Sequence, residues 1–400
     1  MKRIIELDGL RGWLLIIIAC NHLYGGYVTQ FTREPLGFVS AAEGFVFLSG
    51  FVAYLVYSRL FDKEKNNASN ILSISISTST SSASKEKGRA PLVTEVDKKI
   101  WHRCLTIYKY HLFSLFFVYA LIWFFPVYKS IWIDFFYTGN LYDNPVSAIG
   151  FAVLLLEQPG YFDILVMYLV PMTFLPFAIK AMKRGQVTWV VVISFSIWLL
   201  AQFINQDILI SAVQYLSPST KLQLSYFDPF AWQWLFYLGV FCSYLRFDKH
   251  FTFVFSPLVK SSLICLALVL MLLKHIEPAW LNALFVDGSL KLLFGESGSV
   301  PILRQINLLL LAYCFFLSMN KLAFIYRASY PVYLGQHALA VFAFHTVAIY
   351  WLYPLFMPQN ATFWYWDLFS CILFITLLSL APVLEKAFNS QNRNPSKKEA

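Results

Sequence analysis

Ten long apolar runs constrain this chain more than any other feature of its sequence. They lie near residues 10–30, 38–60, 105–127, 160–181, 187–205, 229–246, 256–274, 302–320, 329–355 and 363–384. A helix needs about 20 apolar residues to cross the roughly 30 Å of hydrocarbon in a bilayer. The chain is 58% hydrophobic and 13% charged, and the charged share is about half the roughly 25% of a soluble domain. The sequence therefore excludes a water-soluble globule and predicts an all-α, polytopic integral membrane protein with about ten transmembrane helices.

The basic residues predict how these helices are oriented. With Met1 inside, most Lys and Arg residues fall on one side, and the other side keeps Arg33, Lys129, Lys221, Lys274, Lys291 and Arg304. Cytoplasmic loops carry such a basic excess. We therefore expect both termini in the cytoplasm, including a tail at 386–400. This bias also accounts for the net charge of +9, and no basic groove interleaved with aromatic residues indicates a nucleic-acid partner.

The interval 62–99 differs in composition from the rest of the chain. A Ser/Thr-rich stretch, 74–84, lies between two charged clusters. Such a composition cannot bury an apolar core. We expect a disordered cytoplasmic loop that acts as an inert linker, with a phosphorylated switch as the alternative.

The cysteines indicate neither a disulfide framework nor a metal site. All six occur singly in or beside apolar runs, without a CxxC pair. Paired spacings are the usual signature of structural zinc. We expect no bound metal.

Two ionisable residues in the first apolar run are functional candidates, because charged groups inside a membrane are costly. Arg11 and His22 are eleven positions apart, which places them on one helix face about 16 Å apart along the axis. No small-residue cleavage site follows this run, so we expect a retained helix rather than a signal peptide. Arg11 is expected to bind an anionic cofactor, and His22, which lies deeper, to exchange a proton.

Glu43 in the second run is expected to lie beside His22. A hairpin symmetric about residues 32–33 places the two side chains at the same depth. A carboxylate next to an imidazole raises its basicity, which suits a general base that acts on a hydroxyl group. The alternative is a buried pair that only ties two helices together. The small residues around Glu43 favour close helix packing over a ligand pocket.

Several motifs together resemble the OpgC family, which belongs with integral-membrane acyltransferases of the acyltransferase-3 type. The motifs, in chain order, are Leu7-Asp8-Gly9-Leu10-Arg11-Gly12, the spacing of Arg11 and His22, residues 42–51 (AEGFVFLSGF), residues 103–111 (RCLTIYKYH), residues 158–163 (QPGYFD) with Tyr168, residues 227–233 (FDPFAWQ) and residues 334–337 (LGQH). The resemblance covers nearly the whole chain except the Ser/Thr-rich loop, which is longer than the family needs. It implies a single membrane acyltransferase domain over residues 1–400.

The resemblance also implies a reaction and a location. The implied enzyme transfers an acyl group, succinyl in the type case, from cytoplasmic acyl-CoA to hydroxyl groups of a periplasmic glucan. The implied location is the bacterial inner membrane. Succinyl-CoA or acetyl-CoA would be a donor substrate, and no cofactor would be permanently bound.

The same resemblance suggests further site residues. Arg11 and Arg103 are the expected contacts for the phosphates of coenzyme A, since guanidinium groups match phosphate oxygens. Tyr108 and His111 are candidates to flank the pantetheine path, with packing as an equal alternative. The acceptor candidates on the far side, for which helix capping and an aromatic belt are the simpler alternatives, are Asp163, Asp228, Trp232 and Gln233. His345 occupies a position where related acyltransferases sometimes carry a histidine, but as a lone His on an apolar helix it is expected to be a packed core residue.

Three alternatives remain open from the sequence. An O-acetyltransferase that acts on another envelope polysaccharide differs only in substrates. A proton-coupled transporter would also use buried His, Glu and Arg residues, but the chain has no visible internal repeat. A structural membrane subunit would leave the shared face of Arg11 and His22 unexplained.

Overall fold

The computed structural model describes most of the chain as helices. It describes residues 3–23, 26–78, 93–204, 226–276, 297–360 and 363–393, together with residues 210, 211, 214, 215, 293 and 295. No strand occurs among these residues. The elements are α1 (Ile5–His22), α2 (Tyr27–Thr32), α3 (Ala41–Thr78), α4 (Glu95–Phe124), η1 (Pro126–Tyr128), α5 (Lys129–Phe136), α6 (Gly139–Asp143), α7 (Pro145–Val153), α8 (Asp163–Lys183), α9 (Val187–Ala201), α11 (Pro229–Phe247), α12 (Pro257–Ile276), η2 (Ser297–Ser299), α15 (Ile302–Ser318), α16 (Ala323–Tyr326), α17 (Ser329–Gln336), α18 (Ala338–Asn360), α19 (Trp364–Leu377) and α20 (Leu380–Arg393).

Six described segments are long and apolar enough to cross a membrane. They are Ala41–Asn67, Glu95–Phe124, Asp163–Lys183, Pro257–Ile276, Ala338–Phe356 and Trp364–Ala387. The predicted all-helical membrane fold is thereby confirmed. The other predicted crossings correspond to α1, which carries three charged residues, to α11, and to the shorter helices α9 and α15.

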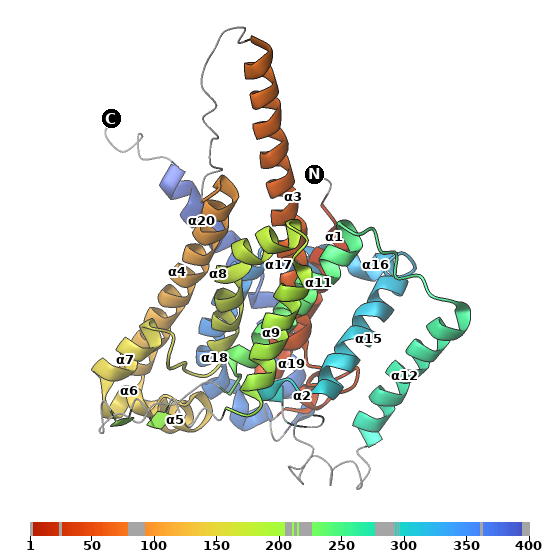
Figure 1. The fold of residues 1–400 in the computed structure, drawn as a ribbon. Coiled ribbons are helices and arrows are strands. Elements are labelled where there is room, and N and C mark those ends of the chain that lie inside the picture. Colours follow the sequence, from red (N-terminus) through yellow and green to blue (C-terminus); the bar gives the residue numbers. More distant parts are fainter. Residues whose placement is uncertain are drawn as a thin grey trace.

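The two ends of the bundle differ in charge. The first described residues and α20 lie at the upper end in Figure 1, which we call the basic end. Ion pairs tie several helices together there: Lys180 with Asp97, Lys183 with both Asp62 and Asp248, and Arg327 with Glu6. The short helices α2, α5 and α6 lie at the other end, which we call the opposite end (Figure 1).

Glycines allow two pairs of helices to pack backbone against backbone. A Cβ atom on Gly12 of α1 would lie 1.8 Å from the carbonyl oxygen of Pro331 in α17. A Cβ atom on Gly50 of α3 would lie 1.9 Å from the carbonyl oxygen of Phe236 in α11. No larger side chain fits at either position. The close packing predicted for the small residues near Glu43 is therefore confirmed at Gly50.

The predicted disordered loop at 62–99 is wrong for part of its length. Helix α3 continues to Thr78, and α4 begins at Glu95. Thr94 caps α4 by accepting the backbone N–H of Asp97 at 3.2 Å. Adding residues to an existing helix is inexpensive, and the Lys and Glu residues after Asp62 have good helix propensity. The rest of the predicted loop, residues 79–92, lies outside the described residues.

Part of the predicted tail at 386–400 is also helical. Helix α20 extends to Arg393, and residues 394–400 lie outside the described residues.

Candidate active site

His22 and His345 form a hydrogen-bonded pair between α1 and α18. Nδ1 of His22 lies 2.8 Å from Nε2 of His345, and the ring centroids are 4.6 Å apart. His345 is buried and also stacks on Phe374, whereas His22, the last residue of α1, is half-buried. A neutral imidazole has one donor and one acceptor nitrogen. The pair therefore has two tautomeric arrangements, one of which leaves Nε2 of His22 without a proton.

The segment before α8 holds Tyr161 against His22. The two rings stack with centroids 3.9 Å apart, and the Tyr161 hydroxyl donates to the backbone carbonyl of His22 at 3.4 Å. Like five other non-glycine residues in the described ranges, Tyr161 has a positive φ, of +70°, a conformation that is uncommon for a residue with a side chain. The N–H of Gly160 donates to the carbonyl of Phe136 at 2.8 Å, and a Cβ atom on Gly160 would lie 3.1 Å from the Phe136 Cα. The QPGYFD motif therefore positions Tyr161.

Polar atoms remain available on His22 and in the QPGYFD motif that carries Tyr161. Across the described ranges, no hydrogen bond engages Nε2 of His22, and the amide of Gln158 is buried with neither of its polar atoms bonded. Buried polar groups without a partner usually have one that the protein alone does not supply, such as a ligand or water. The same ranges contain no group of three or more His, Cys, Asp or Glu side chains that could hold a metal ion. The arrangement suits proton transfer to Nε2 of His22.

The predicted contact between Glu43 and His22 is wrong. Glu43 is 1% exposed and accepts two hydrogen bonds from Arg304 of α15, at 2.7 and 2.9 Å, and one from the backbone N–H of Ser40 at 2.6 Å. Arg304 also donates to Glu34 at 2.7 Å. The symmetric hairpin fails because α2 and the irregular residues 33–40 separate α1 from α3. The carboxylate of Glu43 is thus engaged by Arg304 and by the backbone of Ser40. The hydrogen-bond partner of His22 is His345, on α18.

Arg11 and Arg103 are cations without an ion pair in the described part of the chain. Arg11 lies three turns before His22 on α1, and its buried Nε has no hydrogen-bond partner. Its guanidinium lies 5.7 Å from the centre of the Phe45 ring. Asp8 and Arg103 are near enough to act on the Arg11 charge, but Asp8 is already paired with Arg3. Guanidinium groups in this state suit charge-assisted hydrogen bonds to an anion with several charged oxygens.

A family model described as OpgC protein matches residues 3–71 and 82–388. The chain belongs to the OpgC family. No curated protein and no solved structure matches it. The internal residues 72–81, which the family model does not match, overlap the Ser/Thr-rich stretch 74–84.

Tyr108 and His111 of this OpgC family member face the segment that holds Tyr161. The Tyr108 hydroxyl donates to the carbonyl of Val153 at 2.9 Å. His111 is 1% exposed and meets the Phe162 ring edge-on, with centroids 5.6 Å apart. Both residues therefore pack against α7 and the segment that carries Tyr161. The structure does not bring them to Arg11.

The two aspartates at helix starts differ in surroundings. Asp228 caps α11 by accepting the N–H of Phe230 at 2.8 Å, and Pro229 occupies the first helical position. Burial raises the pKa of Asp228 above its ordinary value. Asp163 is the first residue of α8, two residues after Tyr161, and is buried. Asp163 therefore lies in the same segment as the ring that stacks on His22, whereas Asp228 has a capping role.

Trp232 and Gln233 lie inside the OpgC helix bundle. Trp232 is fully buried, and its Nε1 donates to the carbonyl of Gly298 at 3.1 Å. Gln233 uses both ends of its amide on Ser194 of α9, accepting from the hydroxyl and donating to the carbonyl, each at 2.7 Å. These contacts tie α11 to α9 and to η2.

Sequence reasoning missed two residues of this site and the ion-pair partner of Glu43. His345 was expected to be a packed core residue, yet it is the partner of His22. Tyr161 was part of a motif, but only its left-handed backbone and its stacking single it out. Arg304 is one of the few basic residues expected on the side opposite the termini. This exception to the distribution of basic residues was the available signal for a buried ion pair.

Proposed function

We propose that this chain is a membrane O-acyltransferase that moves an acyl group from cytoplasmic acyl-CoA to hydroxyl groups of a periplasmic glucan. Membership in the OpgC family suggests a glucan-modifying acyltransferase in general terms. Succinyl is the acyl group that the resemblance favours, with succinyl-CoA as donor. The proposal also includes kinship with the acyltransferase-3-type enzymes.

The observation that carries the proposal is the hydrogen bonding and stacking of the His22 imidazole. When Nδ1–H of His22 donates to Nε2 of His345, the lone pair on Nε2 of His22 is free and unprotonated. The Tyr161 ring packs against the imidazole and limits its rotation. In this arrangement the hydrogen bond to His345 keeps the proton of His22 on Nδ1 and Tyr161 sets the orientation of the ring, as a general base requires.

The proposed chemistry follows from this arrangement. Nε2 of His22 takes the proton of the acceptor hydroxyl while the hydroxyl oxygen attacks the thioester carbonyl. The carbon–sulfur bond then breaks, and the thiolate of coenzyme A leaves. The proton passes from Nε2 to the sulfur, which restores neutral His22 and yields an ester and free coenzyme A.

Arg11 and Arg103 are proposed to hold the donor. Their unpaired charges lie between the basic end and His22, where phosphates entering from the basic end would meet them. Charge-assisted contacts of this kind contribute about 1.5–3 kcal/mol each. The thioester would then extend toward His22, about 16 Å further along α1.

This model requires a defined topology. We propose ten crossings by α1, α3, α4, α8, α9, α11, α12, α15, α18 and α19, with the basic end in the cytoplasm and the protein in a bacterial inner membrane. The ion pairs and basic residues gathered at the end that holds both described termini support this orientation. Reporter fusions after α20 and in the α18–α19 connection test it directly.

The decisive experiment compares purified His22→Gln and His102→Ala proteins. Transfer of labelled succinyl from succinyl-CoA to a linear glucan is measured in detergent. His102 is an exposed histidine of α4 and serves as the matched control. Loss of a general base costs about 100- to 10,000-fold in rate, so His22→Gln should lose at least 100-fold while His102→Ala keeps the native rate.

Three outcomes count against the proposal. Near-native turnover by a folded His22→Gln protein removes His22 from the reaction. Absence of both transfer and succinyl-CoA hydrolysis in the unmodified protein favours the transporter alternative. For the donor site, Arg11→Gln should raise the KM for succinyl-CoA about 10- to 150-fold, with exposed Arg184→Gln as control, and an effect on the acceptor KM alone would contradict the model.

A further inference from the structure

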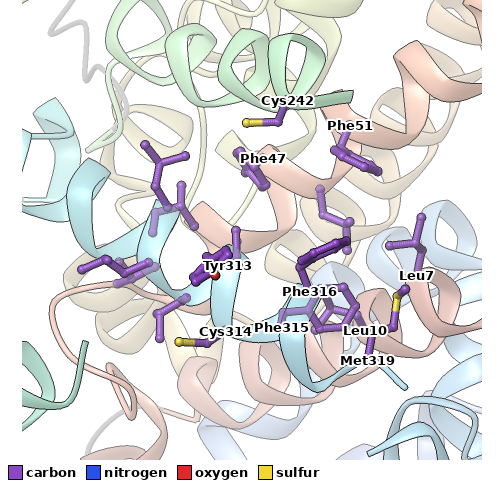
Figure 2. Close-up of a pocket in the computed structure, with 18 of the residues that line it drawn as sticks. Leu7, Leu10, Phe47, Phe51, Cys242, Tyr313, Cys314, Phe315, Phe316 and Met319 are labelled. Atoms are coloured by element: carbon purple, nitrogen blue, oxygen red, sulfur yellow. The ribbon is translucent and has the colours of Figure 1, made fainter. Parts of the chain in front are cut away.

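An apolar groove of about 840 Å³ runs along α1, and neither Arg11 nor His22 lines it. Side chains from α1, α3, α11 and α15 surround it, as Figure 2 shows for Leu10, Phe51 and Cys242. Along α1 it reaches from Ile4 to Ile17, a length of about 20 Å at 1.5 Å per residue. The groove therefore extends over more than one leaflet of a bilayer, whose full hydrocarbon core is about 30 Å.

The protein does not fill this groove because α12 stands away from the bundle. Only 11% of the membrane-spanning part of α12 is buried, and its apolar contacts form a small cluster with α15 that is separate from the main core. Figure 1 shows α12 at the edge, beyond α15. Leu309 and Phe255 line the groove and are also exposed, at 39% and 38%. The groove thus reaches the protein surface, where hydrocarbon surrounds it.

Two arginines stand at the end of the groove nearest the basic end. Arg246 lines the groove from α11, and its guanidinium lies 5.8 Å from the centre of the Phe316 ring on α15. Arg59 lies 4.9 Å from the centre of the Phe247 ring, which also lines the groove. Neither arginine forms an ion pair with a carboxylate in the described ranges. Among the described residues, the apolar groove therefore ends at two guanidinium groups without a carboxylate partner.

We propose that this groove binds an anionic phospholipid from the leaflet at the basic end. One acyl chain lies along the groove, and the phosphate contacts Arg246 with Arg59 beside it. Basic pockets between transmembrane helices on the cytoplasmic side suit anionic headgroups, and each Lys or Arg near such a headgroup contributes measurably. A peptide segment is a poor occupant, because its backbone N–H and C=O groups would find few partners on these walls. The bound lipid completes the packing between α12 and the bundle, at a site separate from the proposed active site.

The test uses the full chain purified in a mild detergent. The protein is incubated with equal amounts of palmitoyl-oleoyl phosphatidylglycerol and the corresponding phosphatidylcholine, then repurified. Bound lipid is quantified by mass spectrometry, and the intact mass is measured under native conditions. The variants are Arg246→Gln, the matched control Arg184→Gln at the same end, and Cys242→Phe, which adds volume inside the groove.

The native protein should retain phosphatidylglycerol in preference to phosphatidylcholine. Arg246→Gln should reduce that preference about fivefold, the factor that corresponds to about 1 kcal/mol for one cation near an anionic headgroup. Arg184→Gln should leave it unchanged, and Cys242→Phe should reduce retention of both lipids. Equal retention of the two lipids, or equal effects of Arg184→Gln and Arg246→Gln, would overturn the proposal. So would a native mass of two chains that Cys242→Phe converts to one, because the groove would then be an interface between copies.

Discussion

Replacing Arg304 with glutamine tests the assignment of Glu43 as a structural residue. Arg304 donates three hydrogen bonds of 2.7 to 2.9 Å to the carboxylates of Glu43 and Glu34. Removing one partner of a buried ion pair leaves an uncompensated charge and costs about 3–5 kcal/mol. We expect Arg304→Gln to lower the free energy of unfolding by that amount. Glu34 keeps a second cation, Lys274, at 3.2 Å, so the loss should fall mainly on Glu43.

The companion variant Glu43→Gln should lose less. It removes the charge-assisted contacts of one carboxylate, about 1.5–3 kcal/mol in total, and leaves Arg304 paired with Glu34. In the double variant the two losses should not add, because both act on the same ion pair. Unfolding is followed by circular dichroism in mixed micelles with increasing dodecyl sulfate, and turnover is measured well below each unfolding transition.

Activity separates the structural assignment from a role in the reaction. If Glu43 only positions α3 and α15, folded Glu43→Gln protein keeps turnover within a few-fold of the native rate, whereas His22→Gln does not. A Glu43→Gln protein of native stability that turns over 100-fold more slowly would refute this reasoning and return Glu43 to the reaction.

Three further predictions follow from single contacts. His345→Phe should lower kcat about 10- to 100-fold, as loss of an orienting partner does at metal sites. His345→Gln should lose less activity and keep the native pH–rate profile, because its amide oxygen can accept Nδ1–H of His22. Equal losses of kcat in the two variants would show that this hydrogen bond is unimportant. Gly12→Ala should abolish the monodisperse peak in size-exclusion chromatography because its Cβ would lie 1.8 Å from a backbone oxygen, whereas Gly150→Ala, with nothing within 4 Å, should not. Burial raises the pKa of Glu34, but the charges of Arg304 and Lys274 more than offset it, so that the pKa lies below the ordinary 4.5. The contribution of Glu34 to stability is therefore complete above about pH 4.5 and is lost as the pH falls through the lower folded pKa, and the difference in Tm between the native protein and Glu34→Gln should shrink between pH 7 and pH 3.

The sequence predicted the features that depend only on the spacing of residues along a single helix. Arg11 and His22 lie on one continuous helix, as their spacing predicts, because an uninterrupted apolar run leaves the backbone no alternative to helical hydrogen bonding in a membrane. The close approach at Gly50 could also be expected from small residues in an apolar run. These features need no knowledge of which helices are neighbours.

Contacts between distant helices could not be predicted in the same way. His345 lies 323 residues from His22, and nothing in the local sequence of α18 identifies its neighbour. The position of Glu43 was estimated by counting residues along a symmetric helical hairpin. The estimate fails because the connection between α1 and α3 contains a further short helix, α2. Arg304 carried a better signal, since a cation in an apolar run on the wrong side of the membrane needs a buried counter-charge.

The length of α3 has a practical consequence for imaging. Its 38 residues correspond to about 57 Å of helix, which is nearly twice the roughly 30 Å of a hydrocarbon core. Figure 1 shows α3 extending above the other helices. The same helix packs tightly on α11 at Gly50, and its outer half continues without a break from this anchored part. A small soluble domain joined in helical register to this outer half would move with the bundle. It would give a 46.2 kDa membrane protein an asymmetric marker for aligning particles in electron cryomicroscopy.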